Sequence, residues 1–215
     1  MPSPLSIAVV DYGAGNLRSV AKALERSDLR PRVTDDPREL VAADGVVLPG
    51  VGAFRDAIAR LSEKGLDTAL REVFASGRPY LGLCLGLQVL FDESSEHGLT
   101  PGLGRLRGKV ERFAETDGQG GLLRVPQIGW NEVRFEGAHP MLEALPEKDY
   151  FYFVHSYRAL AEDPEQIVGR ADYGGDFAAA VAADNVFAVQ FHPEKSQGAG
   201  KRLLDAYRAW VEASR

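Results

Sequence analysis

The chain has 215 residues, of which 45% are hydrophobic and 26% are charged, values ordinary for a globular protein. These proportions exclude a collagen-like, coiled-coil or intrinsically disordered chain, and the length predicts a single domain spanning residues 1–215. The net charge is −6 and there is no basic run, so nucleic acid is an unfavourable partner because its phosphate backbone is also negative.

The chain contains one cysteine, Cys84, and four histidines. A single cysteine forms no internal disulfide, and the histidines lack the spacings typical of zinc sites, so we expect neither a metal nor another cofactor. The longest mostly apolar stretch, residues 80–91, is too short to cross a bilayer, and the N-terminus lacks the charged start of a secretory signal. We therefore expect a cytoplasmic protein that does not contact membranes.

The first ninety residues alternate between short apolar runs and helical spacing. The run at 7–10 is typical of a buried strand, and apolar residues at 17, 20, 21 and 24 then form one face of a helix that Asn16 caps. Apolar runs at 46–48 and 80–83, with helical stretches over 54–61 and 66–74 between them, repeat the pattern. Strands without a polar face, separated by helices, predict a parallel sheet covered on both faces.

Beyond residue 105 the helices become rare, and short strand patterns follow one another. We expect strands at 109–113, 131–135, 150–154, 167–171, 178–183 and 186–191, the last two joined by a hairpin turn at Asp184-Asn185, and a final helix over 200–213. Residues 117–121 form a loop. The predicted fold is α/β, with a mostly parallel central sheet, helices on both of its faces and antiparallel additions in the C-terminal half.

Cys84 lies where an apolar strand meets the start of a helix, in the sequence GLCLGLQ of residues 82–88. A glycine two residues to each side permits the sharp turn that presents a nucleophile, and the amides of a helix beginning at Leu85 favour the thiolate. Gln88 follows one helical turn later and can face the same site. The alternative interpretation is that Cys84 is a small buried apolar residue.

A histidine and a glutamate follow another apolar strand, in the sequence FHPEKS of residues 191–196. In an extended segment, residues i and i+2 point the same way, so Glu194 can lie beside His192, and Pro193 keeps His192 out of the helical region. A carboxylate beside a histidine orients the ring and stabilises its protonated form. The alternative is a surface turn with incidental charges.

Two glycine-containing segments invite further interpretations. Residues 49–52, PGVG, end a strand where backbone amides can approach an anion, although an ordinary strand-to-helix connection is more typical of the segment alone. Gly13-Ala14-Gly15 suggests a dinucleotide fingerprint, but Arg18 stands at its last glycine position, and the nucleotide interpretation is poor. Of the other histidines, His155 is more typical of a structural residue in an aromatic strand, and His97 and His139 are typical of loops.

The motifs at 82–88 and 191–196 resemble the nucleophile and His-Glu signatures of class I, triad-type glutamine amidotransferases, and the resemblance covers essentially the whole chain. Within that family the chain is most similar to glutaminase subunits of imidazole glycerol phosphate synthase, an enzyme of histidine biosynthesis. The motifs that carry this are DYGAGN (11–16), PGVGAF (49–54), PQIGWN (126–131) and VHSYR (154–158). Gln127 departs from the pattern, since a histidine is more usual there. The loop 115–122 has no clear family signature.

The resemblance implies a role for each matched residue. Cys84 would be the nucleophile, His192 the general base and acid, and Glu194 the carboxylate that orients His192. Glutamine would bind against Gly52, Leu85, Gln88 and the backbone of His155, Ser156 and Tyr157. The amides of Val51 and Leu85 would stabilise the oxyanion, either as they stand or after a peptide near Gly50-Val51 reorients.

The resemblance also implies a partner. The chain is too short to house the (βα)8-barrel cyclase that consumes the ammonia, since such a barrel alone takes about 250 residues. That cyclase would be a separate subunit in a heterodimer, and it would form imidazole glycerol phosphate and an aminoimidazole carboxamide ribonucleotide. Four residues match family positions near the interface: Asn16, Trp130, Tyr152 and Lys195. Each also has an ordinary structural explanation, since Asn16 can cap a helix, Trp130 can pack, Tyr152 can belong to the core and Lys195 can be a solvated charge.

Three alternatives stay open. The first is a glutaminase that serves another synthase, such as an anthranilate, guanylate or pyridoxal phosphate synthase, but the motifs DYGAGN and GWN disfavour it. A cysteine peptidase or hydrolase on a similar sheet is disfavoured by Gln88 and the HPE motif. A non-catalytic, flavodoxin-like interaction module with an inert Cys84 belongs to a different class, and the reactivity of the thiol separates it from the others.

Overall fold

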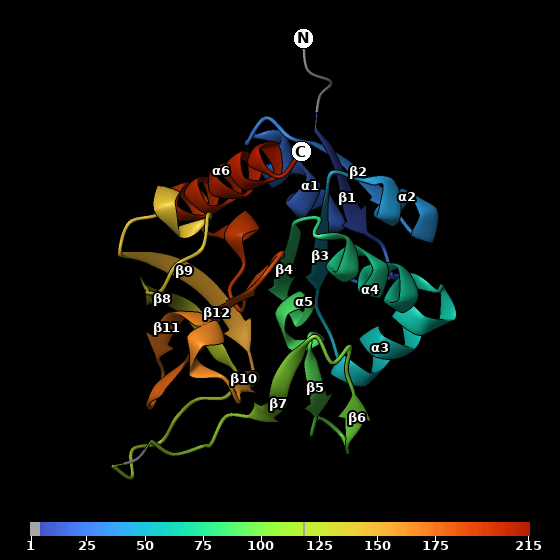
Figure 1. Cartoon of the computed structure of the whole chain (residues 1–215). Coiled ribbons are helices and arrows are strands. Elements are labelled where there is room, and N and C mark those ends of the chain that lie inside the picture. Colours follow the sequence, from blue (N-terminus) through green and yellow to red (C-terminus); the bar gives the residue numbers. More distant parts are fainter. Residues whose placement is uncertain (1–4, 118) are drawn as a thin grey trace.

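The computed structural model describes residues 5–117 and 119–215, so Gly118, in the loop without a family signature, lies outside the described residues. The chain forms a nine-stranded sheet in the order β2-β1-β3-β4-β13-β12-β11-β8-β9 (Figure 1). The first five strands in this order are parallel: β2 (Arg30–Thr34), β1 (Ser6–Val10), β3 (Gly45–Gly50), β4 (Tyr80–Cys84) and β13 (Val186–Val189).

The other four strands are antiparallel to their neighbours: β12 (Asp176–Ala183), β11 (Ile167–Asp172), β8 (Gln127–Phe135) and β9 (Lys148–His155). The predicted fold class is therefore confirmed, with four parallel strands from the N-terminal half, β13 as the fifth, and antiparallel additions in the C-terminal half. The hairpin at Asp184-Asn185 joins β12 to β13 as predicted, with Asp184 at a φ of 51°.

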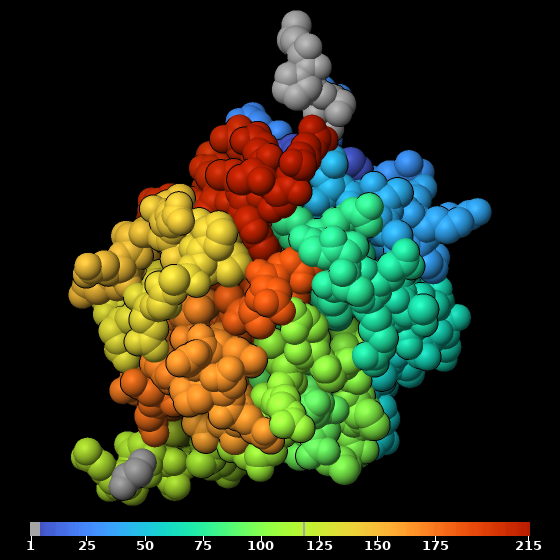
Figure 2. Space-filling model, in the orientation of Figure 1, coloured from blue at the N-terminus to red at the C-terminus, as the bar shows by residue number. Residues whose placement is uncertain are grey.

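Alternate residues of the parallel strands belong to two different apolar cores. Ile7 and Val9 of β1 pack in one core with helices α1 (Leu17–Glu25) and α6 (Gln197–Ala213). Ala8 and Val10 pack in the other core with α2 (Pro37–Ala42), α3 (Phe54–Glu63) and α4 (Leu66–Ser76). Strands that are apolar on both sides thus lie between two helical layers, as predicted. In Figure 2, α6, drawn in red, lies against the yellow segment around residue 142, where the short helix η1 (Leu142–Ala144) contacts it.

The structure contains a second, four-stranded sheet, which the sequence patterns did not predict as separate from the first. Its order is β10-β7-β5-β6, formed by β10 (Tyr157–Ala161), β7 (Leu106–Arg112), β5 (Phe91–Ser94) and β6 (Thr100–Pro101). The strand expected at 109–113 belongs to this sheet. Its apolar residues, among them Leu106, Val110 and Ala159, extend the core that contains α3 and α4.

The sequence patterns did not predict two elements near the N-terminus. Strand β2 lies at the edge of the sheet and reads Arg-Pro-Arg-Val-Thr, so it carries no buried apolar run, and Val33 is 43% exposed. Helix α2 is short, and its signal was the Asp36-Pro37 pair: the Asp36 side chain accepts a hydrogen bond from the Arg38 amide, and Pro37 occupies the first turn.

The carboxyl ends of four parallel strands meet at one edge of the large sheet. Tyr12 follows β1, Gly50 ends β3, Cys84 ends β4 and His192 follows β13. Ligands of open α/β sheets collect at this edge. Within the described residues, none of the helices has the length and apolarity needed to cross a bilayer.

Candidate active site

Cys84 sits in a sharp turn between β4 and the one-turn helix α5 (Leu85–Gln88). Its φ is 53°, a left-handed conformation that a side chain rarely adopts and that is typical of nucleophile elbows. A Cβ atom at Gly82 would lie 2.4 Å from the Gly86 carbonyl oxygen, and one at Gly86 would lie 2.0 Å from the Leu48 carbonyl oxygen. Both glycines are therefore sterically required, as the spacing around Cys84 predicted.

His192 and Glu194 form the predicted pair. The His192 Nδ1 atom lies 2.8 Å from Glu194 Oε1, and both side chains are 4% exposed. Pro193 opens the short helix η3 (Pro193–Lys195), and His192 keeps an extended backbone before it. Burial disfavours the charged ring, but Cys84 and Glu194 outweigh burial and raise the pKa of His192 from 6.5 to about 9. The ring is therefore held protonated beside the sulfur at neutral pH.

Gln190 contacts Cys84 from the strand end that leads to His192, and the sequence did not single it out. The Gln190 Nε2 atom donates to Cys84 Sγ at 3.5 Å, and Gln190 Oε1 accepts a hydrogen bond from Gln88 Nε2 at 3.0 Å. Gln88 Nε2 also donates to the Tyr157 carbonyl oxygen at 3.1 Å. Gln190 is completely buried. The two amides therefore connect the sulfur to the backbone of β10.

A cavity of about 330 Å³ opens beside the sulfur. It is lined by Cys84, His192 and seven of the eight residues predicted to bind substrate or the oxyanion: Val51, Gly52, Leu85, Gln88, His155, Ser156 and Tyr157. The eighth, Gly50, pairs with Cys84 in the register of β3 and β4. The structure thus brings the predicted residues together, and it adds Glu96 to the lining. The Glu96 carboxylate also accepts a hydrogen bond from the Phe54 amide at 2.7 Å.

His155 is a buried neutral ring. Burial lowers its pKa from 6.5 to about 4, Nδ1 lies 2.8 Å from the Tyr157 carbonyl oxygen, and Nε2 lies 2.9 Å from the side-chain amide of Gln127. The contact atom of Gln127 is Oε1, which like the Tyr157 carbonyl oxygen only accepts, so the neutral ring donates from one nitrogen at a time. Gln127, the departure from the family pattern, therefore replaces a histidine without leaving the His155 ring unpaired. The side chain of His155 has a structural role, as the sequence favoured.

Apolar rings lie exposed on one face of the β8–β9 pair. Trp130 is 48% exposed and packs edge-on against Tyr152 with ring centroids 6.2 Å apart, while Lys195 Nζ lies 5.8 Å from the centre of the Tyr152 ring. Ile128 and Tyr150 extend this face. Asn16 is exposed and caps α1, its side chain accepting from the Ser19 amide. Of the four residues expected near a partner, Trp130, Tyr152 and Lys195 therefore lie together.

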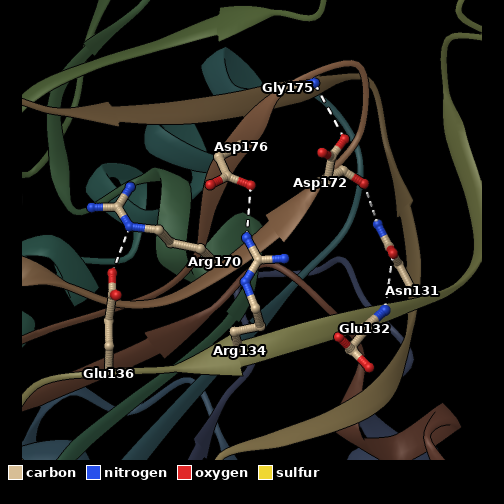
Figure 3. Close-up of polar contacts among 8 residues, drawn as sticks. All are labelled: Asn131, Glu132, Arg134, Glu136, Arg170, Asp172, Gly175 and Asp176. Atoms are coloured by element: carbon tan, nitrogen blue, oxygen red, sulfur yellow. Dashed lines mark hydrogen bonds and ion pairs between the residues drawn. The ribbon is translucent and has the colours of Figure 1, made fainter.

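Asn131 points to the opposite side of the sheet from Trp130. Its Nδ2 atom donates to the Asp172 carbonyl oxygen at 2.8 Å, and the neighbouring Arg134 forms an ion pair with Asp176 at 2.8 Å (Figure 3). These contacts fasten β8 to β11 and β12. The two consecutive residues thus differ in role: Trp130 presents an exposed ring, and Asn131 fastens β8 to β11 through its hydrogen bond.

Comparisons with known proteins agree with this geometry. A family model described as glutamine amidotransferase class-I matches residues 8–207. Imidazole glycerol phosphate synthase subunit HisH of Methylococcus capsulatus is 50% identical over 210 residues, which are 95% of this chain and 96% of that protein. The protein of the same description from Desulfitobacterium hafniense is 48% identical over 205 residues, which are 95% of this chain and 94% of that protein.

Solved structures show the same fold at lower identity. PurLQS from Thermotoga maritima superposes with a TM-score of 0.76 at 20% identity, over 97% of this chain and all of the compared chain. A crystal structure of a glutamine amidotransferase gives a TM-score of 0.74, also at 20% identity, over 96% of this chain and 98% of that one. The chain therefore belongs to the class I glutamine amidotransferase family, in the group whose curated members are HisH subunits of imidazole glycerol phosphate synthase.

Proposed function

We propose that this chain is the glutaminase subunit of an imidazole glycerol phosphate synthase and that Cys84, His192 and Glu194 carry out the hydrolysis. The observation that carries the proposal is the buried His192–Glu194 pair, 2.8 Å apart, whose histidine shares with Cys84 the wall of one cavity of about 330 Å³. Each residue supplies what nucleophilic catalysis needs: a thiolate, a proton donor and acceptor, and an orienting carboxylate.

The reaction proceeds in two steps. The Cys84 thiolate attacks the side-chain amide carbon of glutamine, His192 donates its proton to the leaving nitrogen, and ammonia departs from a γ-glutamyl thioester. Water then attacks the thioester, His192 takes a proton from it, and glutamate leaves with the Cys84 thiolate and the protonated His192 restored. The amides of Leu85 and Val51 stabilise the oxyanion of both tetrahedral intermediates.

The cavity residues divide the recognition of glutamine between them. Gln88 is held by Gln190 and by the Tyr157 carbonyl, so its position beside the sulfur is fixed before substrate arrives. The backbone of His155, Ser156 and Tyr157 forms the opposite wall. The carboxylate of Glu96 has the charge to bind the α-ammonium group of glutamine.

The ammonia is consumed by a separate (βα)8-barrel cyclase subunit, which forms a heterodimer with this chain and produces imidazole glycerol phosphate. The exposed face formed by Ile128, Trp130, Tyr150, Tyr152 and Lys195 is where we place that subunit, because aromatic and apolar side chains are enriched at interface centres. Asn16, which caps α1, is assigned to the same interface, since α1 contacts the short helix η3 that contains Lys195. We infer a cytoplasmic location, since the lone cysteine must stay reduced.

The test is a glutaminase assay with and without the purified cyclase and its nucleotide substrate. We expect slow hydrolysis by the isolated chain, a large increase when both are present, and no hydrolysis by Cys84→Ala under either condition. Hydrolysis by Cys84→Ala at the normal rate contradicts the catalytic assignment. Activation by a different synthase, but not by this cyclase, contradicts the pathway.

A further inference from the structure

Ser196 lies at the N-terminal cap position of α6 but does not cap the helix. Serine is preferred at this position because its hydroxyl usually accepts a hydrogen bond from an amide of the first helical turn. Here the side chain makes no such hydrogen bond. Ser196 is nevertheless completely buried, and buried hydroxyl groups find hydrogen-bond partners. The partners of this hydroxyl lie outside the helix, and they point to a different role.

The Ser196 hydroxyl joins the turn that contains His192 to strand β9. Its oxygen accepts a hydrogen bond from the Tyr152 amide at 3.0 Å and donates to the His192 carbonyl oxygen at 2.6 Å. The His192 amide donates in turn to the Tyr152 carbonyl oxygen at 2.9 Å. Both backbone groups of His192 are therefore fastened to Tyr152, the amide directly and the carbonyl through the serine hydroxyl.

Strand β9 comes last in the order of the nine-stranded sheet, so one of its edges faces the turn instead of a strand. Tyr152 lies opposite Trp130 of β8, yet its amide and its carbonyl both bond to the turn. In an antiparallel ladder the backbone groups of alternate residues point away from the paired strand, and at an edge they need other partners. His192 and Ser196 supply these partners, and the serine oxygen takes the place of a strand carbonyl.

The direction of the His192 ring depends on this backbone. Glu194 holds the ring itself through the 2.8 Å contact at Nδ1, but the φ and ψ angles of His192, −108° and 95°, set where its side chain leaves the chain. The His192 carbonyl also accepts from the Lys195 amide at 3.0 Å, a contact within the turn. The Ser196 hydroxyl differs from that amide because it continues to β9 and so links the carbonyl to the sheet.

We propose that Ser196 is a positioning residue for the glutaminase reaction, whose hydroxyl fixes the His192 backbone on β9 and so keeps the ring aimed at Cys84. This inference rests on the proposed glutaminase function and adds one residue to it. Ser196 is not among the residues that line the catalytic cavity, so it acts on the reaction through His192. A purely structural role for the hydroxyl would change the stability of the protein but not the behaviour of His192.

The variant Ser196→Ala removes the hydroxyl and keeps the rest of the side chain. We expect the kcat for glutamine to fall about tenfold, because small displacements of a catalytic group slow a reaction strongly. The factor should be the same with and without the cyclase and its nucleotide, since the same histidine acts in both cases. The KM should change by about twofold at most, because the cavity wall is unaltered.

Alkylation of Cys84 by iodoacetamide reports on His192 without any glutamine. The thiolate displaces iodide directly, and a protonated ring beside the sulfur favours that thiolate. The raised pKa of His192, about 9, depends on its contacts with Cys84 and Glu194, so a displaced ring loses its proton at lower pH. We expect Ser196→Ala to be alkylated several-fold more slowly than the parent chain at about pH 7. The difference should disappear above pH 9, where the parent ring is neutral as well.

Two further variants complete the experiment. Ser196→Thr keeps the hydroxyl and should retain most of the parent kcat and the parent alkylation profile. The matched control is Ser27→Ala, because Ser27 is also completely buried but its hydroxyl makes no hydrogen bond with a described residue. That control should leave both measurements unchanged.

Either a parent kcat or a parent alkylation profile in folded Ser196→Ala overturns the assignment of Ser196, and the proposed function then stands if the cyclase activates the parent chain. If Ser196→Ala does not fold, a folded Ser196→Thr with the parent kcat supports the assignment, and one with a lowered kcat overturns it. If the parent chain hydrolyses no glutamine with or without the cyclase, the proposed function itself fails, and the alkylation rates still decide whether Ser196 positions His192.

Discussion

The side chains that control Cys84 come from another part of the chain. His192 and Gln190 both follow β13, and they flank a sulfur that is itself held in a strained backbone conformation. Helix α5 is a single turn, so its dipole adds little to thiolate stability. The protonated His192 ring and the Gln190 amide are therefore the groups placed to interact with the sulfur.

The raised pKa of His192 sets a pH dependence for Cys84 reactivity. Below about pH 9 the ring carries a positive charge beside the sulfur and favours the thiolate; above it the ring is neutral and this effect disappears. We therefore expect iodoacetamide to alkylate the parent chain several-fold faster than His192→Asn at pH 6.5–7, because a cation beside the sulfur favours its reactive anionic form, on the order of the effect of a neighbouring charge on a cysteine. The ratio should approach one as the pH rises past 9.

A rate ratio that is constant from pH 6.5 to 9.5 contradicts the role of His192 charge. Glu194→Gln provides the intermediate case. That substitution keeps the side-chain volume but removes the carboxylate that lies 2.8 Å from Nδ1, so the His192 pKa should fall and the decline should move to lower pH.

Gln190→Leu tests the amide that donates to the sulfur. The substitution removes the 3.5 Å contact to Sγ and deprives Gln88 of one acceptor, so we expect kcat/KM for glutamine to fall by about tenfold. Alkylation of Cys84 by iodoacetamide at pH 7 should also become slower. A loss of activity with an unchanged alkylation profile contradicts a role at the sulfur and assigns Gln190 to the fixing of Gln88.

At the scale of elements, β9 connects the exposed aromatic face to His192, the proposed catalytic histidine. The Tyr152 carbonyl accepts a hydrogen bond from the His192 amide at 2.9 Å, and the Tyr152 amide donates to Ser196 Oγ at 3.0 Å. Ser196 Oγ in turn donates to the His192 carbonyl oxygen at 2.6 Å. A subunit bound at the Tyr152 ring, as we propose, would therefore act on a strand that is hydrogen-bonded directly to the turn containing His192.

Trp130→Ala tests the aromatic face. The side chain is half exposed, so we expect the free energy of unfolding to change by less than about 0.5 kcal/mol. The affinity for the cyclase should fall about tenfold or more, because exposed tryptophans at interface centres are frequent hot spots. Titration of the cyclase in the glutaminase assay measures both the affinity and the maximal activation.

The control for Trp130 is Val33→Ala. Val33 is 43% exposed on β2, at the opposite edge of the nine-stranded sheet from β9, so its truncation should leave the affinity unchanged. Equal affinities for Trp130→Ala and the parent chain place the partner on a different surface.

At the scale of the whole molecule, α6 closes one side of the sheet that presents the site. Tyr207 and Val211 of this helix pack on the start of β3, where a Cβ atom on Gly45 would lie 2.6 Å from the Tyr207 hydroxyl oxygen and 2.9 Å from Val211 Cγ2. The last helix of the chain is thereby fixed against a strand whose other end holds Gly50.

Gly45→Ala is expected to destabilise the protein without changing its chemistry. The added methyl group forces α6 and β3 apart, at a cost of about 1–3 kcal/mol, which thermal or urea unfolding measures. The iodoacetamide reactivity of Cys84 in the folded variant should stay normal. Gly198→Ala, also on α6, meets only an Arg202 nitrogen at 3.6 Å and should be neutral or stabilising by up to about 1 kcal/mol. Equal destabilisation of both variants contradicts this packing.

The sequence by itself determined the features that depend on neighbouring residues. The sharp turn at Cys84 follows from glycines two residues to each side, and the His192–Glu194 pair follows from an extended backbone held by Pro193. The spacing of hydrophobic residues along the chain predicted the α/β class, because buried strands and amphipathic helices differ in that spacing. The exposed edge strand β2 escaped this reasoning, since a strand without a buried run leaves no such pattern.

Only the tertiary structure decided which distant residues meet. Gln190 contacts Cys84 across 106 positions, and the Tyr12 hydroxyl lies against Gly50 from the end of a neighbouring strand. Two further features also depend on contacts between distant residues: the separate four-stranded sheet and the contact of Lys195 with the Tyr152 ring. The physical reason is that crossovers between parallel strands bring the ends of remote segments to one edge of the sheet, and strand order, which no local pattern encodes, selects the neighbours.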